Sequence, residues 1–235
     1  MRKIFIAMKI ILHLPIDIWQ MFITYLPGRI GELLRYIYWK KRLSYLGKNV
    51  KIDVGVYFQN PEFISLDDKC WIDRNVIILA GKPRGSRITY ERGNPDFILN
   101  IGEVYIGKFT HIAPNCVLSG IGGLYIGKNS GVASNSTIYS FSHHYRNLVD
   151  RKDTNQYSFT PLARQDQQSM ILSPVVISDY CAIGLNSVIL PGASLKIGSW
   201  IASNSTISKR YPEQSLIYEQ KVEEVKSLSN YQILK

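Results

Sequence analysis

The segment 177–207 reads ISDYCAIGLNSVILPGASLKIGSWIASNSTI. A large aliphatic residue stands at every sixth position of it: Ile177, Ile183, Ile189, Leu195, Ile201 and Ile207. Four residues after each of the first five is a small residue: Cys181, Ser187, Ala193, Ser199 and Ser205. A period of six fits neither a helix nor a free-standing strand. It is typical of a solenoid in which a short strand and a corner recur three times per triangular coil. We therefore predict that the aliphatic residue fills the coil and the small residue fits a tight corner.

The same register extends over most of the chain. Blocks of three hexads begin at Leu46, Leu66, Ile106 and Ile126, and the long run supplies two more, from Ile177 and Leu195. Chance would break this register within a few hexads. The sequence therefore predicts an all-β solenoid of about six triangular coils over residues 46–210.

The spacing between the blocks locates two long insertions. Successive starts differ by 20, 40, 20, 51 and 18 residues, so the excess over one coil is large twice, over 79–105 and 139–176. Both insertions follow the third hexad of a coil, and their coils are two apart. At roughly 4.8 Å per stacked strand, their roots lie about 10 Å apart. Because loops on a rigid scaffold usually carry chemistry, this edge is the candidate active site.

Composition and charge bound the class of partner. The 235 residues carry a net charge of +10 and are 46% hydrophobic, which suits one repeat domain with appendages. The positive charge favours an anionic partner, such as a phosphorylated cofactor or a lipid surface, or serves only solubility. Nucleic-acid binding is disfavoured, because the basic residues scatter and no aromatic–basic motif appears.

The three cysteines Cys70, Cys116 and Cys181 each occupy the small fourth position of a hexad. They are expected to fill corners, not to form disulfides, and their separation gives no metal-ligand spacing. We therefore expect no metal and a cytoplasmic location, where thiols stay reduced.

The two ends of the chain differ from the middle. Residues 1–45 are apolar and basic, with +6 of the net charge before residue 43, no cleavage site and too many polar interruptions for a membrane span. Helices there fit two roles: contact with an anionic membrane surface, or a cap on the solenoid. The tail 211–235 is expected to carry a short helix near 218–228, with Val222, Val225 and Leu228 on one face.

Two histidines stand at the root of the second insertion, in Tyr139-Ser-Phe-Ser-His-His-Tyr145. A lone loop histidine is usually surface decoration, but the position of His143 and His144 on the edge chosen by the spacing favours a functional role. His13 and His111 are expected to be structural. The first insertion carries four cations among glycines and prolines, and is either a solvated loop or a basic lip that receives an anionic acceptor: Lys82, Arg84, Arg87 and Arg92.

Two segments, IGLNSVILPGAS (183–194) and IASNSTISK (201–209), resemble the closing coils of hexapeptide-repeat acyltransferases. That resemblance implies a left-handed parallel β-helix. Residues 112–143 are similar, without gaps, to the stretch that leads to the catalytic histidine in the galactoside and maltose acetyltransferase branch. The basic apolar N-terminal helices look more like those of enzymes that acetylate surface-polysaccharide sugars.

The implied chemistry is acyl transfer from acetyl-CoA to a sugar hydroxyl. A neutral imidazole can take the hydroxyl proton during attack, and the resemblance assigns this role to His143, with His144 as the second choice or a substrate contact. Ala113 stands where the simple sugar acetyltransferases often have a substrate-binding Asn, and Asn115 nearby is the expected substitute. The resemblance also implies a homotrimer that binds acetyl-CoA between neighbouring subunits, through Gly184, Ser203, Ser208, Lys209 and Lys221. The assignment of Lys221 is the weakest match to the family. The segment Tyr218-Glu-Gln-Lys221 stands where the family usually has Gly-Asn-Pro-Ala-Lys.

Three functions stay open at this level. The first is an O-acetyltransferase acting on a surface polysaccharide or its precursor, at the inner face of the membrane or free in the cytoplasm. The second is an N-acyltransferase acting on an amino sugar, which requires no change of fold. The third is a non-catalytic solenoid that binds a partner. A zinc enzyme on this fold is set aside, because adjacent His143 and His144 do not suit its spaced ligands.

Overall fold

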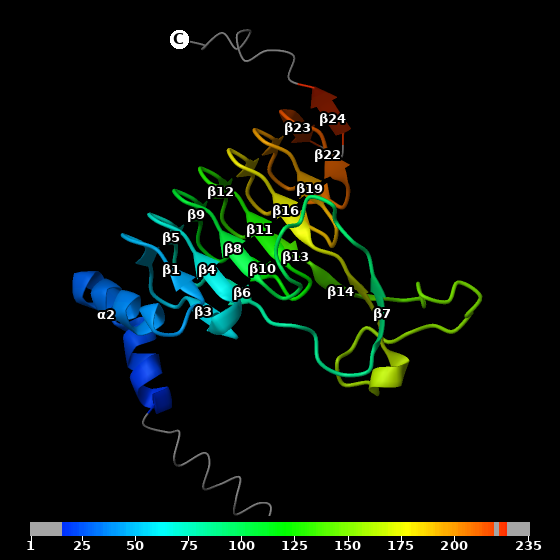
Figure 1. Cartoon of the computed structure of the whole chain (residues 1–235), viewed down its shortest axis with the longest axis horizontal. Coiled ribbons are helices and arrows are strands. Elements are labelled where there is room, and N and C mark those ends of the chain that lie inside the picture. Colours follow the sequence, from blue (N-terminus) through cyan, green and yellow to red (C-terminus); the bar gives the residue numbers. More distant parts are fainter. Residues whose placement is uncertain (1–15, 219–220, 225–235) are drawn as a thin grey trace, which may run out of the picture.

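The computed structural model describes residues 16–218 and 221–224, and its centre is a solenoid with three sheets (Figure 1). Sheet A contains β1 (Tyr45–Leu46), β4 (Ile64–Leu66), β8 (Val104–Ile106), β11 (Leu124–Ile126), β16 (Val175–Ile177), β19 (Ser194–Leu195) and β22 (Arg210–Tyr211). Sheet B contains β2 (Lys51–Ile52), β5 (Trp71–Ile72), β9 (His111–Ile112), β12 (Gly131–Val132), β17 (Ala182–Ile183), β20 (Trp200–Ile201), β23 (Ser215–Tyr218) and β24 (Lys221–Glu224). Sheet C contains β3 (Tyr57–Gln59), β6 (Ile77–Leu79), β10 (Val117–Ser119), β13 (Thr137–Tyr139), β18 (Val188–Ile189) and β21 (Thr206–Ile207). Each coil adds one strand to each sheet, so the predicted parallel β-helix is confirmed.

The six-residue period is the register of the core. Strands pair in parallel so that equivalent positions stack, as Ile126 does on Ile177 and Ile138 on Ile189. The six periodic aliphatic residues of 177–207 are each at most 2% exposed. Because burying such a side chain contributes about 1.5–3 kcal/mol, the stacked column is the main source of stability.

The corners explain the other sequence signals. Asn75, Asn115, Asn135, Asn186 and Asn204 all have positive φ at the corner between sheets B and C. Asparagine tolerates this left-handed conformation better than most residues. The small fourth-position residues are buried, as predicted, since they fit under the next coil.

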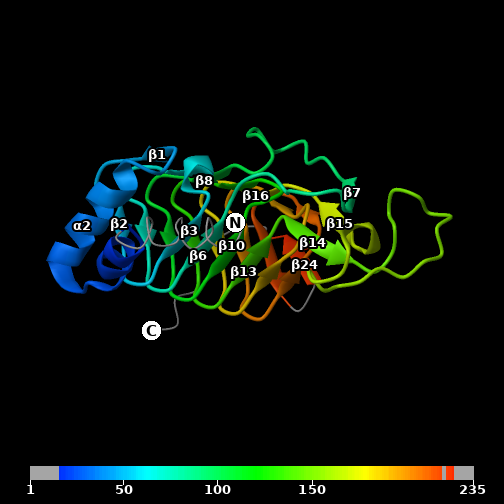
Figure 2. The same ribbon diagram turned by 90° about the horizontal axis from the view of Figure 1, so that it is seen from below.

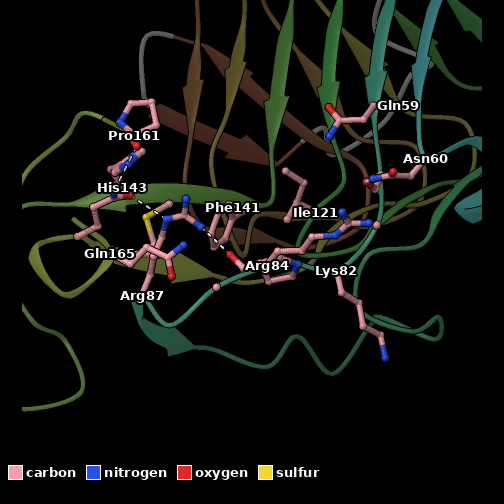
Figure 3. Close-up of a pocket in the computed structure, with 16 residues that line it drawn as sticks. Gln59, Asn60, Lys82, Arg84, Arg87, Ile121, Phe141, His143, Pro161 and Gln165 are labelled. Carbon is pink, nitrogen blue, oxygen red and sulfur yellow. Dashed lines mark hydrogen bonds between the residues drawn. The ribbon is translucent and has the colours of Figure 1, made fainter. Parts of the chain in front are cut away.

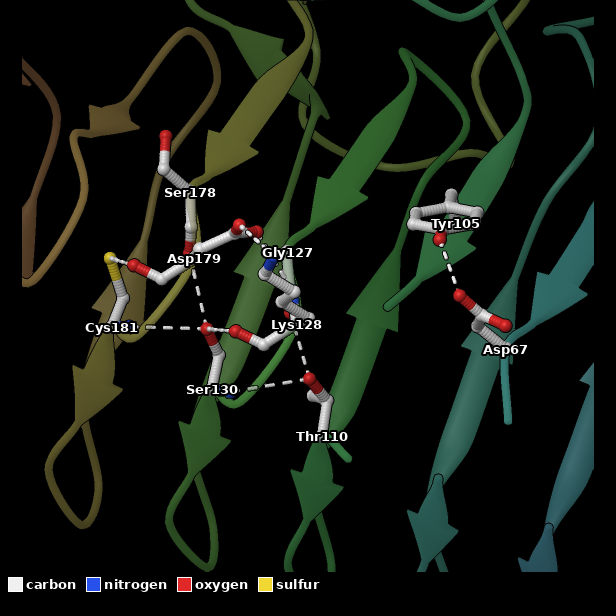
Figure 4. Close-up of polar contacts among 9 residues, drawn as sticks. All are labelled: Asp67, Tyr105, Thr110, Gly127, Lys128, Ser130, Ser178, Asp179 and Cys181. Atoms are coloured by element: carbon white, nitrogen blue, oxygen red, sulfur yellow. Dashed lines mark hydrogen bonds and ion pairs between the residues drawn. The ribbon is translucent and has the colours of Figure 1, made fainter. Parts of the chain in front are cut away.

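Hydroxyl and thiol groups at the corner between sheets A and B tie neighbouring coils together (Figure 4). Thr110 Oγ1 donates to Gly127 O at 2.7 Å, and Ser130 Oγ donates to Ser178 O at 3.1 Å. The Sγ atom of Cys181 donates to Lys196 O of the next coil at 3.2 Å. All three cysteines are free and buried, as their corner positions predicted.

The solenoid continues past the predicted boundary at residue 210. Strands β22 and β23 begin a seventh turn, and Tyr211 and Ile217 are buried in it. The helix expected near 218–228 is not found where the structure describes this tail, because β24 pairs antiparallel with β23 and places Val222 opposite Ile217. Residues 219–220 and 225–228 of that predicted helix lie outside the described residues.

Two helices close the other end of the column (Figure 2). Residues 16–25 are helical, α2 spans Gly28–Lys40, and residues 1–15 lie outside the described part. Trp39 packs edge-on against Phe58 of the first coil, with ring centroids 4.8 Å apart. Within the described residues, no helix is long and apolar enough to cross a bilayer.

The two insertions leave from the same corner, between sheets C and A, and meet. In the second insertion, β14 (Phe141–His144) pairs antiparallel with β15 (Ser169–Leu172). Strand β15 also pairs in parallel with β7 (Ile88–Glu91) of the first insertion. Two single-turn helices, η1 (Pro61–Phe63) and η2 (Gln165–Gln167), complete the elements. This three-stranded sheet, called sheet D here, stands beside the solenoid at the edge that the spacing selected (Figure 1).

Candidate active site

The root of the second insertion is fixed by Ser140, which is fully buried. Its Oγ donates to Ser119 O at 2.8 Å and accepts from the backbone N–H of Gly122 at 2.9 Å. Both partners belong to the coil below. The chain therefore enters β14 from a rigid point, and the residues that follow are held in position.

Strand alternation turns His143 toward a cavity. Successive side chains of a strand point to opposite faces, so Phe141 and His143 share one face of β14. Both line a cavity of about 470 Å³ between sheet D and the corners of the coils (Figure 3). The Nε2 atom of His143 is buried and has no hydrogen-bond partner in the part of the chain that the structure describes. Buried polar atoms are nearly always paired, so the unpaired imidazole nitrogen at the cavity wall makes His143 a candidate functional residue.

His144 lies on the opposite face of β14 and does not line this cavity. Its Nδ1 is 2.9 Å from Arg146 O, and its ring stacks on that of Tyr145 with centroids 4.8 Å apart. The neighbouring loop therefore holds His144. Of the two candidate histidines, His143 is the one that the structure places at the cavity.

Asp96 holds residues 92–97 of the first insertion, called the strap here, against the start of the sixth coil. Lys196 Nζ lies 2.6 Å from Asp96 Oδ1, and Ser194 Oγ donates to Asp96 Oδ2 at 2.7 Å. Nearby, Arg92 Nη2 donates to Pro191 O at 2.6 Å, which holds the strap at a second point. These contacts fix the second half of the first insertion. The first half, residues 80–87, forms part of the cavity wall.

We expect Asp96→Asn to loosen this strap in a pH-dependent way. The hydrogen bonds from Lys196 and Ser194 hold the pKa of Asp96 below its ordinary value. The ionised carboxylate therefore stabilises the strap fully at pH values above the ordinary carboxyl pKa. This stabilisation is lost as the pH falls through the lowered pKa. The pair is partly exposed, so we expect a cost of only about 1 kcal/mol.

Hydrogen exchange of residues 92–97 should be faster in the variant at neutral pH and equal to wild type in acid. Asp166→Asn, in an exposed pair with Arg164, is the control, and an equal effect there would contradict the strap.

Four of the five residues assigned to acetyl-CoA by resemblance occupy the fifth and sixth coils. Gly184 and Ser203 stack at the corner between sheets B and C, where a Cβ on Gly184 would lie 2.5 Å from Ser203 N. Ser208 and Lys209 are exposed at the corner between sheets C and A, after β21. The two pairs thus flank the last strands of sheet C. Lys221 lies in β24, and its side chain is outside the description.

Asn115 is not brought to His143 within one chain. It is exposed at the corner between sheets B and C, and accepts a hydrogen bond from Asn75 Nδ2 at 3.3 Å. His143 follows the opposite end of a sheet C strand. A contact between Asn115 and the acceptor therefore stays a prediction.

The thiols are unsuited to act as nucleophiles at this site. Burial raises the pKa of Cys70 to about 12, and that of Cys116 and Cys181 to about 11 each. The thiolate is the reactive form, so such groups stay inert near neutral pH. Across residues 16–218 and 221–224, no cluster of three or more His, Cys, Asp or Glu could hold a metal ion.

Other cavity residues gave no sequence signal. Gln168 and Met170 line the wall, and both are buried. They reach it because β15 pairs with β14 and places Met170 opposite His143. Pairing across a loop of this length has no periodic signature, so only the structure identifies them.

The chain shares its fold with solved acyltransferases. A variant of AntD, an N-acyltransferase from Bacillus cereus, was solved in complex with dTDP-4-amino-4,6-dideoxyglucose and coenzyme A. It superposes with a TM-score of 0.63 at 19% sequence identity, over 81% of this chain and 87% of AntD. AntD with dTDP and 3-hydroxybutyryl-CoA also gives 0.63, at 18% identity over 81% and 86% of the two chains.

A second similar protein is VCA0836, a hexapeptide-repeat-containing acetyltransferase from Vibrio cholerae solved with acetyl coenzyme A. It gives a TM-score of 0.50 at 19% identity, over 88% of this chain and 82% of its own. No protein-family model matches the chain, and no curated protein is significantly similar to it in sequence. At these identities the likeness shows the fold, which is that of hexapeptide-repeat acyltransferases.

Proposed function

We propose that this protein is an acyltransferase that moves an acetyl group from acetyl-CoA to a sugar, with His143 as the general base. The observation that carries the proposal is the buried, unpaired Nε2 of His143 at the wall of a cavity on a fold shared with AntD and VCA0836. The role of general base is assigned to His143 because an imidazole can carry a proton and because this residue lies where the two insertions meet.

The proposed mechanism needs one proton carrier. A neutral imidazole takes the hydroxyl proton as the sugar oxygen attacks the thioester carbon, which makes the oxygen a competent nucleophile. The same imidazole then returns the proton to the departing sulfur as the carbon–sulfur bond breaks. Atoms balance with one free thiol and one acylated sugar per turnover. The inert cysteines favour this direct transfer over an acyl-cysteine route.

For the acceptor we propose a hydroxyl of a surface-polysaccharide sugar or of its precursor. A hydroxyl is a poor nucleophile while protonated, so a dedicated base such as His143 has most to contribute there. Transfer to an amino sugar is the second candidate, favoured by the likeness to AntD, which was solved with an amino sugar nucleotide. The fold accommodates both.

The test is acetyl-CoA turnover, followed by free-thiol release, against acceptors supplied as matched pairs that differ only in hydroxyl or amine. Release stimulated by the hydroxyl partner supports O-acetylation, and release stimulated only by the amine supports the second candidate. The absence of CoA binding would overturn both acyltransferase candidates. The remaining function would then be that of a non-catalytic binding module.

We also propose that three copies assemble, as the resemblance implies. Trp71 and Trp200 are exposed on the outer face of sheet B, by 44% and 60%, and large exposed apolar side chains often mark interfaces. A solution mass of one or two chains by light scattering would contradict this.

Finally, we propose that the N-terminal helices dock on the inner face of an anionic membrane, with the reaction in the cytoplasm. Large apolar side chains there are 48–70% exposed: Ile16, Ile18, Trp19, Met21, Phe22, Tyr25, Ile30, Leu33 and Ile37. Exposed cations stand beside them, at Arg29, Lys40, Lys41 and Arg42. Apolar residues flanked by cations suit an interfacial helix on anionic lipid.

The helices should bind vesicles of phosphatidylglycerol and not of phosphatidylcholine. Replacing both Trp19 and Phe22, whose rings stack 5.8 Å apart, with Ser should weaken binding by about tenfold or more, because each loses buried apolar area. Vesicle co-sedimentation measures this. Val149→Ser, at an exposed apolar residue of the second insertion, should leave binding unchanged. An equal loss in both variants would contradict the docking surface.

A further inference from the structure

The cavity beside His143 extends in one direction along the solenoid. Its wall includes residues at or after the ends of β3, β6 and β10, in the first three coils, and residues of β14: Gln59, Asn60, Gly81, Ile121 and Phe141 among them. Four of the five residues assigned to acetyl-CoA lie on the other side of His143, in the fifth and sixth coils. His143 therefore stands between the two, and the cavity is placed to hold the acceptor and not the donor.

The charged lining of this cavity is entirely positive. Lys82, Arg84 and Arg87 line it, and no Asp or Glu does. None of the three is in an ion pair within the described ranges. A cleft lined by one sign of charge concentrates ligands of the opposite sign.

The arginine donors are arranged differently from the lysine. Arg87 donates from Nε to Gln168 Oε1 at 2.8 Å and from Nη1 to Arg84 O at 2.7 Å, which fixes the direction of its guanidinium. Figure 3 shows the guanidinium of Arg84 pointing across the cavity toward Asn60, whereas the amine of Lys82 points away from the other labelled residues. A free guanidinium at the wall suits a phosphate group, which arginine binds through paired hydrogen bonds, and Arg87 adds a second positive charge to the same cavity.

We propose that Arg84 is the phosphate ligand of the acceptor subsite, in a cavity to which Arg87 adds positive charge, so that the acylated sugar is one linked to a phosphate or diphosphate. This inference rests on the proposed function and specifies its substrate class. The cavity, of about 470 Å³, lies in the range usual for small-molecule sites and has room for a sugar with its phosphate. The same subsite chemistry serves a nucleotide-linked or a lipid-linked sugar.

Inorganic pyrophosphate is the probe, titrated calorimetrically into the full chain already saturated with coenzyme A. We expect pyrophosphate to bind in the presence of coenzyme A, and Arg84→Gln to weaken this binding about tenfold to a hundredfold. Arg151→Gln is the control, because it removes the same charge from an exposed arginine of the second insertion that does not line the cavity. Its effect should be less than about threefold, as for a distant exposed charge.

Three outcomes would overturn the subsite: no pyrophosphate binding, displacement of pyrophosphate by coenzyme A, or equal losses in the two variants. Parallel titrations with dTDP and with geranyl diphosphate separate the sources, since tighter binding of the first indicates a nucleotide-linked acceptor and of the second a lipid-linked one. Failure of the subsite is distinct from failure of the function. Acetyl-CoA turnover without pyrophosphate binding removes only the subsite, whereas pyrophosphate binding without coenzyme A binding removes the acyltransferase.

Discussion

His143→Ala should lower kcat about 10²- to 10⁴-fold while leaving the fold and the affinity for coenzyme A unchanged. This is the range usually lost with a general base, because the acceptor hydroxyl then attacks while still protonated. The Nε2 of His143 makes no hydrogen bond to the rest of the described chain, so its removal breaks no hydrogen bond at that atom. Free-thiol release under saturating acetyl-CoA and acceptor measures the loss.

His144→Ala is the matched control for this prediction. The two histidines are adjacent, but His144 is held at Arg146 O on the other face of β14. We expect kcat to fall by less than about tenfold in this variant, since the proton carrier remains. If His144→Ala loses more activity than His143→Ala, the roles are reversed. If neither loses activity, proton transfer belongs to another group.

Arg35→Ala should release the N-terminal helices from the solenoid. Arg35 is only 2% exposed, and its guanidinium donates to Ile52 O at 2.7 Å, Leu26 O at 2.6 Å and Ile23 O at 3.1 Å. These three carbonyls belong to the first coil, the turn between the helices and the first helix. Each buried group left unpaired costs about 1–3 kcal/mol, so we expect a loss of about 3 kcal/mol or more.

Hydrogen exchange resolves this effect by region. Amides of residues 16–40 should exchange much faster in Arg35→Ala, while those of the central coils keep wild-type protection, because each coil of a solenoid contacts only its neighbours. Arg42→Ala is the control: its side chain lies over the Tyr38 ring, 3.6 Å from the centroid, on an exposed residue. Equal acceleration in both variants would show that Arg35 is not the tie between helices and solenoid.

The solenoid was predictable because its period is set by geometry. Each coil must place an aliphatic residue inside and a small residue at a corner, and Ile177 to Ile207 repeats this without interruption. The end of the solenoid was not predictable in the same way. The spacing between successive buried residues is four from Ile207 to Tyr211 and six again from Tyr211 to Ile217. The seventh turn is therefore out of register with the six-residue period of the preceding coils.

The predicted tail helix shows how tertiary pairing overrides a local pattern. Val222 fits the apolar face of a helix in sequence, but the structure pairs it with Ile217 in β24. The exposed edge of β23 offers unpaired backbone groups that a following segment can satisfy as a strand. The secondary structure of a short amphipathic segment therefore depends on the element that it packs against.

The candidate site was predictable only in part. Insertion spacing placed His143 at the edge where the two insertions meet, and the run Lys82 to Arg87 suggested a basic lip. Which histidine faces the cavity depends on the alternation of β14, and the aim of Arg84 depends on how sheet D folds back over the coils. Neither follows from one-dimensional spacing, because both arise from contacts between the two insertions.

The most direct test of the central claim is acceptor-dependent release of coenzyme A by the wild-type protein, measured with the mass of the acceptor before and after reaction. We predict one thiol released for each acetyl group gained by the sugar, and collapse of both in His143→Ala. A protein that binds no acetyl-CoA, or that releases thiol without any mass gained by the acceptor, would contradict the assignment as an acyltransferase.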